Sequence, residues 1–441
     1  MNYESEIDFL IFAFSNIRMH QVFNSFSQSI PPLRYDLQRY TAHSNGETVV
    51  AFYDQMGYAT PNFALPADSE SLLSLIDGNR SIDDIMHFCT PDITKHDVLR
   101  YVQFLDKHAL LESTSFRHKS AELEHQYEQH TTHATSLTDG AVPNSAEEVT
   151  TWLDDAFRTY PTLTPHHKAI ALYAPHIDPR VGMKSYVRAF SAVRHLKPKR
   201  VVILGTSHYS GWYQDLYKEH PFIFSGKSFH LPNGIAPSIG QEQLLNALNQ
   251  PVKHANTPPS FDARQAGLSL HDRAFRVEHS IDIHALFLNH IWSHPFEIIP
   301  ILVGNLDEIL YQRDGYTGKQ LQSFAEAMRR AFPPSKDTFY LISGDLSHVG
   351  KKFGDDRPAH TFFDDVEAFD LQFLNAAADS SRELHSVMQS NYDAFRICGF
   401  PPLMAFKTMF PSIRGTVLGR ELWDERDRES AVSYGSILFE E

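Results

Sequence analysis

Two short apolar runs that each lead to a histidine restrict the fold of this chain more than any other feature. Ala-Leu-Tyr-Ala-Pro-His spans 171–176, and Val-Val-Ile-Leu-Gly-Thr-Ser-His spans 201–208. In α/β proteins, functional side chains follow the carboxyl ends of buried strands. With a helix between them, the two runs are predicted to be neighbouring strands, with His176 and His208 at one edge of a sheet. An imidazole there can bind a metal or move a proton, and a hydrogen-bonded structural histidine is the alternative for either residue alone.

From residue 145 onward, apolar strands alternate with amphipathic helices. This alternation predicts a mostly parallel sheet with helices on both faces, followed by an antiparallel-looking end. The expected strands are 169–175, 200–206, 296–303, 338–344, 415–423 and 431–439. The expected helices are 145–158, 183–195, 278–292, 317–331, 360–378, 381–390 and 400–410. The stretch 209–276 is expected to be irregular, with hairpin-like pieces.

The amino-terminal part has a different pattern. Asn45-Gly46 separates two alternating runs, which predicts a hairpin. Three short helices are expected after it, at 68–76, from Ser81 onward and at 96–108. We therefore predict a small winged-helix-like α+β domain over 1–115, a polar linker over 116–144 and an α/β domain over 145–441. The linker histidines, among them His133, are expected to be solvated.

The charge balance excludes some classes of partner. The chain has 441 residues and a net charge of −15, which argues against nucleic acid or an anionic membrane as the main partner. The only cysteines are Cys89 and Cys398, so no disulfide framework is expected. The apolar run Phe9–Phe14 is too short for a signal peptide or a membrane span. We expect a cytoplasmic protein, and the amino-terminal domain is expected to dock a peptide or protein rather than DNA.

Three further motifs carry residues suited to chemistry. Glu278 and His279 open an expected helix, where the alternative is a capping carboxylate beside a solvent histidine. Asp345 and His348 follow an apolar strand and a glycine, so the carboxylate can orient the imidazole or both can face one pocket. Cys398 precedes a helix, whose dipole favours a thiolate, and the alternative is an inert buried cysteine.

Together these motifs resemble the Memo family, specifically its long bacterial form of the AmmeMemoRadiSam system protein B type. The motifs that carry the resemblance are Pro175-His-Ile-Asp, Gly205-Thr-Ser-His, Glu278-His-Ser-Ile-Asp, Gly344-Asp-Leu-Ser-His-Val-Gly and Ile397-Cys-Gly-Phe-Pro-Pro. The resemblance implies a three-layer α/β/α domain similar to that of class III extradiol dioxygenases.

The resemblance also implies roles for the site residues. A metal would be bound by His176, His208 and Cys398. Asp345 and His348 would line the same pocket, and Glu278 and His279 would lie nearby, all four with catalytic roles. The dioxygenases use a carboxylate where this chain has Cys398, and the first motif here reads His-Ile-Asp-Pro-Arg-Val-Gly instead of the His-Ala-Gly-Tyr form of many members.

These residues predict a non-haem metal oxidoreductase that uses dioxygen on a small molecule or a modified residue. Iron as Fe²⁺ is the expected metal, and copper or zinc are the alternatives because a thiolate is a soft ligand. A second hypothesis is a non-catalytic, metal-bearing binding module or scaffold in a maturation system, with a protein partner at the amino-terminal domain. A zinc hydrolase is a third, chemically allowed by the same ligands.

Overall fold

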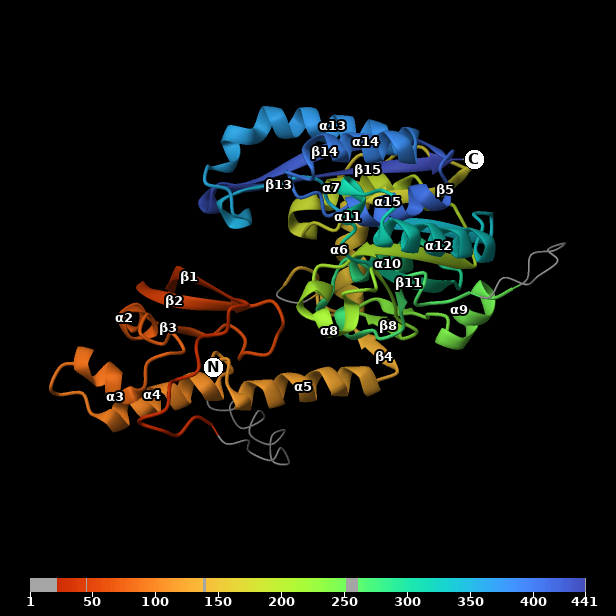
Figure 1. Cartoon of the computed structure of the whole chain (residues 1–441). Coiled ribbons are helices and arrows are strands. Elements are labelled where there is room, and N and C mark those ends of the chain that lie inside the picture. The colour runs from red at the N-terminus through yellow and green to blue at the C-terminus, as the bar shows by residue number, and fades with distance from the viewer. Residues whose placement is uncertain (1–21, 45, 138–139, 251–260, 441) are drawn as a thin grey trace. The chain divides into compact units, whose positions relative to one another are not determined.

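The computed structural model describes residues 22–44, 46–137, 140–250 and 261–440. The chain forms two compact units, Met1–Gln126 and Tyr127–Glu441 (Figure 1). The apolar run Phe9–Phe14 lies outside the described residues. Among the helices that are described, none combines the length and the apolar character that crossing a membrane requires.

The first unit contains the predicted hairpin. Strands β1 (Leu37–Ser44) and β2 (Glu47–Asp54) pair antiparallel, and β3 (Ala64–Pro66) joins β2. Asn45 lies outside the described residues, and Gly46 has a φ of 82°, which suits a glycine in a tight turn. The helical segments are α2 (Ser69–Leu73), α3 (Ile82–Ile85), η1 (Met86–Phe88) and α4 (Lys95–Lys107). Capping boxes start α3 and α4, and both helices bury apolar residues in this unit's own core.

The segment expected to be a polar linker contains two regular elements. Helix α5 (Thr114–Gln129) is followed by strand β4 (Thr132–Ala134), which belongs to the second unit and pairs there with β8 (Ser228–Leu231). The expectation that His133 is solvated is wrong, because its side chain is fully buried. The sequence pattern misses this burial because a three-residue strand gives little periodic signal.

The second unit is built on a nine-stranded mixed sheet in the order β10-β7-β11-β6-β12-β5-β15-β13, with β14 paired to β15. The mutually parallel centre consists of β11 (Glu297–Val303), β6 (Arg200–Thr206), β12 (Thr338–Ser343) and β5 (Ala169–Ala174). The remaining strands are β7 (Phe222–Phe224), β10 (Leu268–Ser269), β13 (His348–Gly350), β14 (Arg414–Glu425) and β15 (Ser430–Glu440). The small strand β9 (Gly234–Ala236) pairs with β8. These strands confirm a mixed α/β fold.

One feature of the sheet corrects the sequence prediction. Strands β5 and β6 are not neighbours, because β12 lies between them and pairs in parallel with both. Tyr340 of β12 is in register with Ala171 of β5 on one side and with Val202 of β6 on the other. The carboxyl ends of three strands, rather than two, therefore meet at the edge that carries the histidines.

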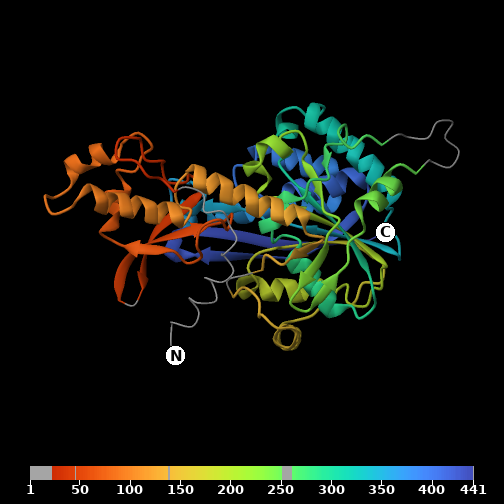
Figure 2. The same cartoon turned by 90° about the horizontal axis from the view of Figure 1, so that it is seen from below.

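Helices lie on both faces of this sheet (Figure 2). One group is α6 (Ala146–Thr159), α7 (Pro179–Ser191) and α10 (Asp282–Ile291). The other is α9 (Gln241–Leu248), α12 (Tyr316–Ala331), α13 (Phe363–Asp379), α14 (Ser381–Asn391) and α15 (Phe400–Met409). Short helical segments are η2 (Ser210–Trp212), α8 (Gln214–Tyr217), η3 (Arg273–Val277), α11 (Glu308–Tyr311), η4 (Lys351–Phe353), η5 (Ala359–Phe362) and η6 (Arg426–Arg428).

Two helices begin four residues away from their predicted starts. The helix expected at 183–195 begins at Pro179, because the Asp178 side chain caps it and proline suits its first turn. The helix expected from Glu278 begins at Asp282. The Glu278 carboxylate accepts the main-chain N–H groups of His279 and Ser280, which holds this stretch as a turn before the helix.

Candidate metal centre

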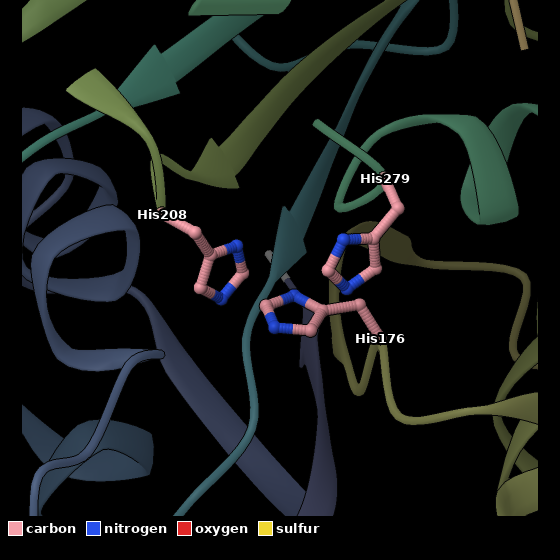
Figure 3. Close-up of side chains that lie close together, drawn as sticks. All are labelled: His176, His208 and His279. Carbon is pink, nitrogen blue, oxygen red and sulfur yellow. The ribbon is translucent and has the colours of Figure 1, made fainter. Parts of the chain in front are cut away.

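Three strand ends bring side chains together at one edge of the sheet. His176 follows β5, His208 follows β6 and Asp345 follows β12, the strand between them. Cys398 and His279 reach the same place from the starts of α15 and α10. Figure 3 shows the rings of His208 and His279 on either side of His176.

The hydrogen bonds of His176 determine which of its ring nitrogens is free. Its Nδ1 lies 3.0 Å from the Ser343 hydroxyl, which itself donates to the main-chain oxygen of Ser280 at 2.6 Å. Because that hydroxyl has only one hydrogen, it must accept from Nδ1–H of His176. The lone pair of His176 is therefore on Nε2, which lies 3.4 Å from the Cys398 sulfur.

Glu278 fixes His208 in the same way. Its carboxylate lies 2.9 Å from Nδ1 of His208 and also accepts the main-chain N–H of His208 at 2.7 Å. A carboxylate can only accept, so Nδ1 of His208 carries the hydrogen and Nε2 faces the centre. A carboxylate behind a ligating histidine is the usual arrangement in metal sites, where it fixes the ring and raises its basicity.

Two close backbone approaches make this geometry possible. A Cβ at Gly344 would lie 2.1 Å from the Cα of Gly399, so only glycines let the end of β12 touch the start of α15. That contact brings Cys398 beside Asp345, whose main-chain N–H donates to the sulfur at 3.2 Å. A Cβ at Gly205 would lie 2.8 Å from the Ser280 hydroxyl, so this glycine lets the Glu278 turn approach β6.

His279 completes a triangle of imidazoles. The ring centroids are 4.9 Å apart for His176 and His208, 5.2 Å for His208 and His279, and 5.4 Å for His176 and His279. One ring nitrogen from each of the three lies within 4.8 Å of the other two. A second set of donors with the same spacing is formed by His176, Asp345 and Cys398.

His348 lies near this centre but is oriented differently from the prediction. Its Nδ1 lies 2.9 Å from the main-chain oxygens of Leu346 and Arg396, which can only accept. Asp345 instead accepts the main-chain N–H groups of His176 and Ile177. Main-chain carbonyls, rather than Asp345, therefore orient His348 and leave its Nε2 without the hydrogen.

The buried charges differ in their ionisation. Burial opposes ionisation of Glu278, but the positive charge of His208 and its hydrogen bond outweigh this and lower the pKa of Glu278 to about 2. Burial raises the pKa of Asp345 to about 7, only partly opposed by the main-chain N–H of His176 and the charge of His208. Burial also raises the pKa of the Cys398 thiol. Burial and then the charge of His208 lower the pKa of His348 to about 4.

The donor set suits some metals better than others. Imidazole and thiolate bind iron, copper and zinc well, whereas calcium and magnesium prefer oxygen ligands. His176 and His208 each have Nδ1 tied to the protein, and the Cys398 sulfur accepts the main-chain N–H of Asp345, so the three main donors are preorganised as a metal site needs. The residues present therefore fit a transition metal.

Ser343 and Ser280 are residues of the site that the sequence prediction missed. Ser343 sets the protonated nitrogen of His176, and Ser280 accepts from Ser343 and donates to the main-chain oxygen of Thr206 at 2.7 Å. Their partners come from three segments that are distant in sequence. A serine at the last position of β12, directly before Gly344-Asp345, is the only local signal.

The chain is similar to proteins of one known family. Residues 135–438 match the family described as Memo-like protein. A MEMO1 family protein of Aquifex aeolicus is 27% identical over 418 residues, which cover 93% of this chain and 99% of that protein. A MEMO1 family protein of Thermus thermophilus is 26% identical over 298 residues, covering 67% of this chain and 79% of that protein.

Proposed function

Because this chain belongs to the Memo family, we propose that it is a metal-binding protein whose ligands are His176, His208 and Cys398. We further propose that it is a non-haem iron or copper redox enzyme that acts on a small molecule or a modified residue with dioxygen. Iron as Fe²⁺ is the proposed metal, with copper and zinc as alternatives. The observation that carries the proposal is the convergence of two imidazole Nε2 atoms, each fixed through Nδ1, with one sulfur that accepts the main-chain N–H of Asp345.

The chain's own residues have distinct roles in this proposal. A bound iron or copper would supply the site for dioxygen and the electron transfer. Glu278 orients His208, and Ser343 orients His176, so both present Nε2 to the centre. His348 is neutral at pH 7 and has a free Nε2, which suits it to accept a hydrogen bond from a bound substrate. Asp345, with a pKa of about 7, can hold or release a proton in the same pocket.

The proposal is tested by metal content. We would purify the full chain anaerobically and measure bound iron and copper in the wild type, in His208→Ala and in His360→Ala, a change at an exposed histidine. Near-stoichiometric metal is expected in the wild type and in His360→Ala, and a large loss in His208→Ala. Equal metal in all three proteins, or none in the wild type, would refute the proposed centre.

A second candidate function is a metal-bearing binding module or scaffold in a maturation system. The composition of the first unit favours this function. Among the described residues, all the clusters that could hold a metal lie in the second unit. The first unit instead exposes the large apolar side chains Tyr35, Phe88 and Phe104, which suit contact with a partner. Nitric oxide distinguishes the two, because an iron enzyme that uses dioxygen needs an open position. Binding of nitric oxide to the iron-loaded protein supports the enzyme, and iron without such binding supports the scaffold.

Four finer features complete the proposal. The second unit would share the three-layer architecture of class III extradiol dioxygenases, and the first would have a winged-helix form that docks a protein or peptide. The chain would have the specific role of an AmmeMemoRadiSam system protein B. A cytoplasmic location is supported by Cys89 and Cys398, which are both free thiols.

A further inference from the structure

We propose that His279 is a fourth metal ligand, so that the centre is bound by three imidazoles and one thiolate. This inference rests on the proposed metal function and adds a residue to its coordination. It also changes the role of His279, which the family resemblance indicates as a residue near the site with a catalytic role. The observation behind it is the triangle of rings at 4.9, 5.2 and 5.4 Å, visible in Figure 3.

The spacing of the nitrogens is compatible with one shared ion. Two imidazole nitrogens bound at about 2.1 Å in tetrahedral geometry lie roughly 3.4 Å apart. One ring nitrogen from each of His176, His208 and His279 lies within 4.8 Å of the other two. A contraction of at most about 1.4 Å is needed, which is within reach of a rotation about the side-chain bonds of a half-exposed residue.

The backbone places His279 relative to His208. The Glu278 carboxylate accepts the main-chain N–H of His208 at 2.7 Å and that of His279 at 3.0 Å. One buried carboxylate therefore ties both residues to the same point. Ring nitrogen Nδ1 of His279 lies 3.6 Å from Glu278, too far for a hydrogen bond, so the ring is not committed to this carboxylate.

Exposure gives His279 a particular position around the ion. The side chains of His176, His208 and His279 are 2%, 27% and 36% exposed. His176 therefore lies on the inner side of the centre, and His208 and His279 lie toward the solvent. An ion that prefers four ligands, such as zinc, would then be fully coordinated by protein, whereas iron, which takes up to six, would keep open positions. His279 would thus determine which metals leave the site open for chemistry.

The test counts imidazoles directly. The full chain is prepared with deuterium in place of hydrogen everywhere except in its histidines, and is loaded anaerobically with Co²⁺. Proton NMR is then recorded, in which only imidazole rings bound to the ion show large hyperfine shifts. We expect three shifted imidazoles in the wild type, three in His360→Ala and two in His279→Ala. The sulfur-to-cobalt charge-transfer band should persist in all three proteins.

Affinity provides the second readout. Competition with a chelator should show that the metal affinity of His279→Ala is about 100-fold weaker than that of the wild type. Losing a residue that only orients a ligand weakens metal affinity by roughly 10–100-fold, so the expected loss lies at the upper end of that range. Two shifted imidazoles in the wild type, or an unchanged spectrum in His279→Ala, would overturn the role of His279. If His208→Ala also keeps the wild-type spectrum and affinity, the proposed metal centre itself fails, so the two failures are distinguishable. The wild-type count does not depend on any variant folding.

Discussion

Two buried carboxyl groups at the site have opposite ionisation, and their partners explain the difference. Glu278 and Asp345 are 1% and 3% exposed, so burial disfavours the charged form of both. Glu278 faces the ring of His208 and three main-chain N–H groups, and its pKa falls to about 2. Asp345 receives only two main-chain N–H groups, and its pKa rises to about 7. Glu278 is therefore a fixed anion, whereas Asp345 can exchange a proton near neutral pH.

Replacing Glu278 with glutamine is expected to weaken metal binding by roughly 10–100-fold, the usual effect of losing the carboxylate behind a ligating histidine. The amide keeps the shape of the side chain but loses the charge that fixes Nδ1–H of His208. Chelator competition with Zn²⁺ on the full chain measures the change. Glu326→Gln, at an exposed position of α12, should bind as the wild type does. Equal affinity of both variants would contradict the orienting role of Glu278.

A buried histidine beside the site makes stability depend on pH. His284 is fully buried near Tyr186 and Phe190, and both of its ring nitrogens lack a hydrogen-bond partner. Burial, and then the charge of His279, lower the pKa of His284 to about 3. Between this value and the ordinary pKa of about 6.5, the unfolded chain binds more protons than the folded one. Stability should therefore fall as the pH drops below about 6.5.

Replacing His284 with leucine should remove this contribution. We expect the second unit to gain about 1–3 kcal/mol at pH 7.5, because two unpaired polar atoms leave the core. At pH 5 the gain in stability should be about 2 kcal/mol larger, because each pH unit below about 6.5 destabilises the wild type by roughly 1.4 kcal/mol. Urea denaturation followed by tryptophan fluorescence measures it, since Trp152, Trp212, Trp292 and Trp423 all lie in the second unit. A variant that loses stability in parallel with the wild type between pH 7.5 and 5 would contradict the assignment.

At the scale of elements, β4 and the residues after it support the turn that holds Glu278. His133 of β4 lies 3.0 Å from Asp282 in the first turn of α10, and both side chains are fully buried. The hydroxyl of Ser136 lies 2.7 Å from the main-chain oxygen of Glu278 and 3.0 Å from the Asp282 carboxylate. The segment expected to be a linker is therefore connected to the carboxylate that orients His208.

Removing the Ser136 hydroxyl should loosen this turn. Because the turn positions Glu278, which orients His208, the metal affinity should fall as well. We expect Ser136→Ala to weaken Zn²⁺ binding by about 10-fold, at the lower end of the effect of a supporting residue. Ser136→Thr keeps the hydroxyl and should restore most of the affinity. Chelator competition gives the affinities, and the apo-protein melting temperatures show whether stability changes in parallel. If threonine and alanine weaken binding equally, the hydroxyl does not support the site.

The sequence predicts the elements of the second unit better than their arrangement. Strands β6 and β11 and helices α6, α12 and α15 lie within one or two residues of their expected ranges, because long periodic runs give a clear signal. The position of β12 between β5 and β6 has no local signal, since it depends on pairing between strands more than 130 residues apart. The sequence indicates Glu278 as a candidate residue, but its local pattern predicts a helix where the structure has a turn, because the partners of Glu278 lie at His208 and Ser280.

At the scale of the whole molecule, the two units have separate apolar cores. Ile82, Val102 and Leu105 belong to the core of the first unit, and Phe324 and Tyr340 to that of the second. The match to the Aquifex protein covers 93% of the chain and so must include most of both units. The site residues belong only to the second unit. A metal that binds there should stabilise that unit and leave the first unaffected.

Thermal unfolding of the full chain can test this separation. We expect two transitions by circular dichroism, which detects both units, and one by tryptophan fluorescence, which detects the second. Anaerobic Zn²⁺ at about 100 times its Kd should stabilise the second unit by about 2.7 kcal/mol and raise only its transition. His208→Ala should abolish the shift, and His360→Ala should keep it. A shift of both transitions would show that metal binding couples the two units, and no shift of the tryptophan transition would place the ion outside the second unit.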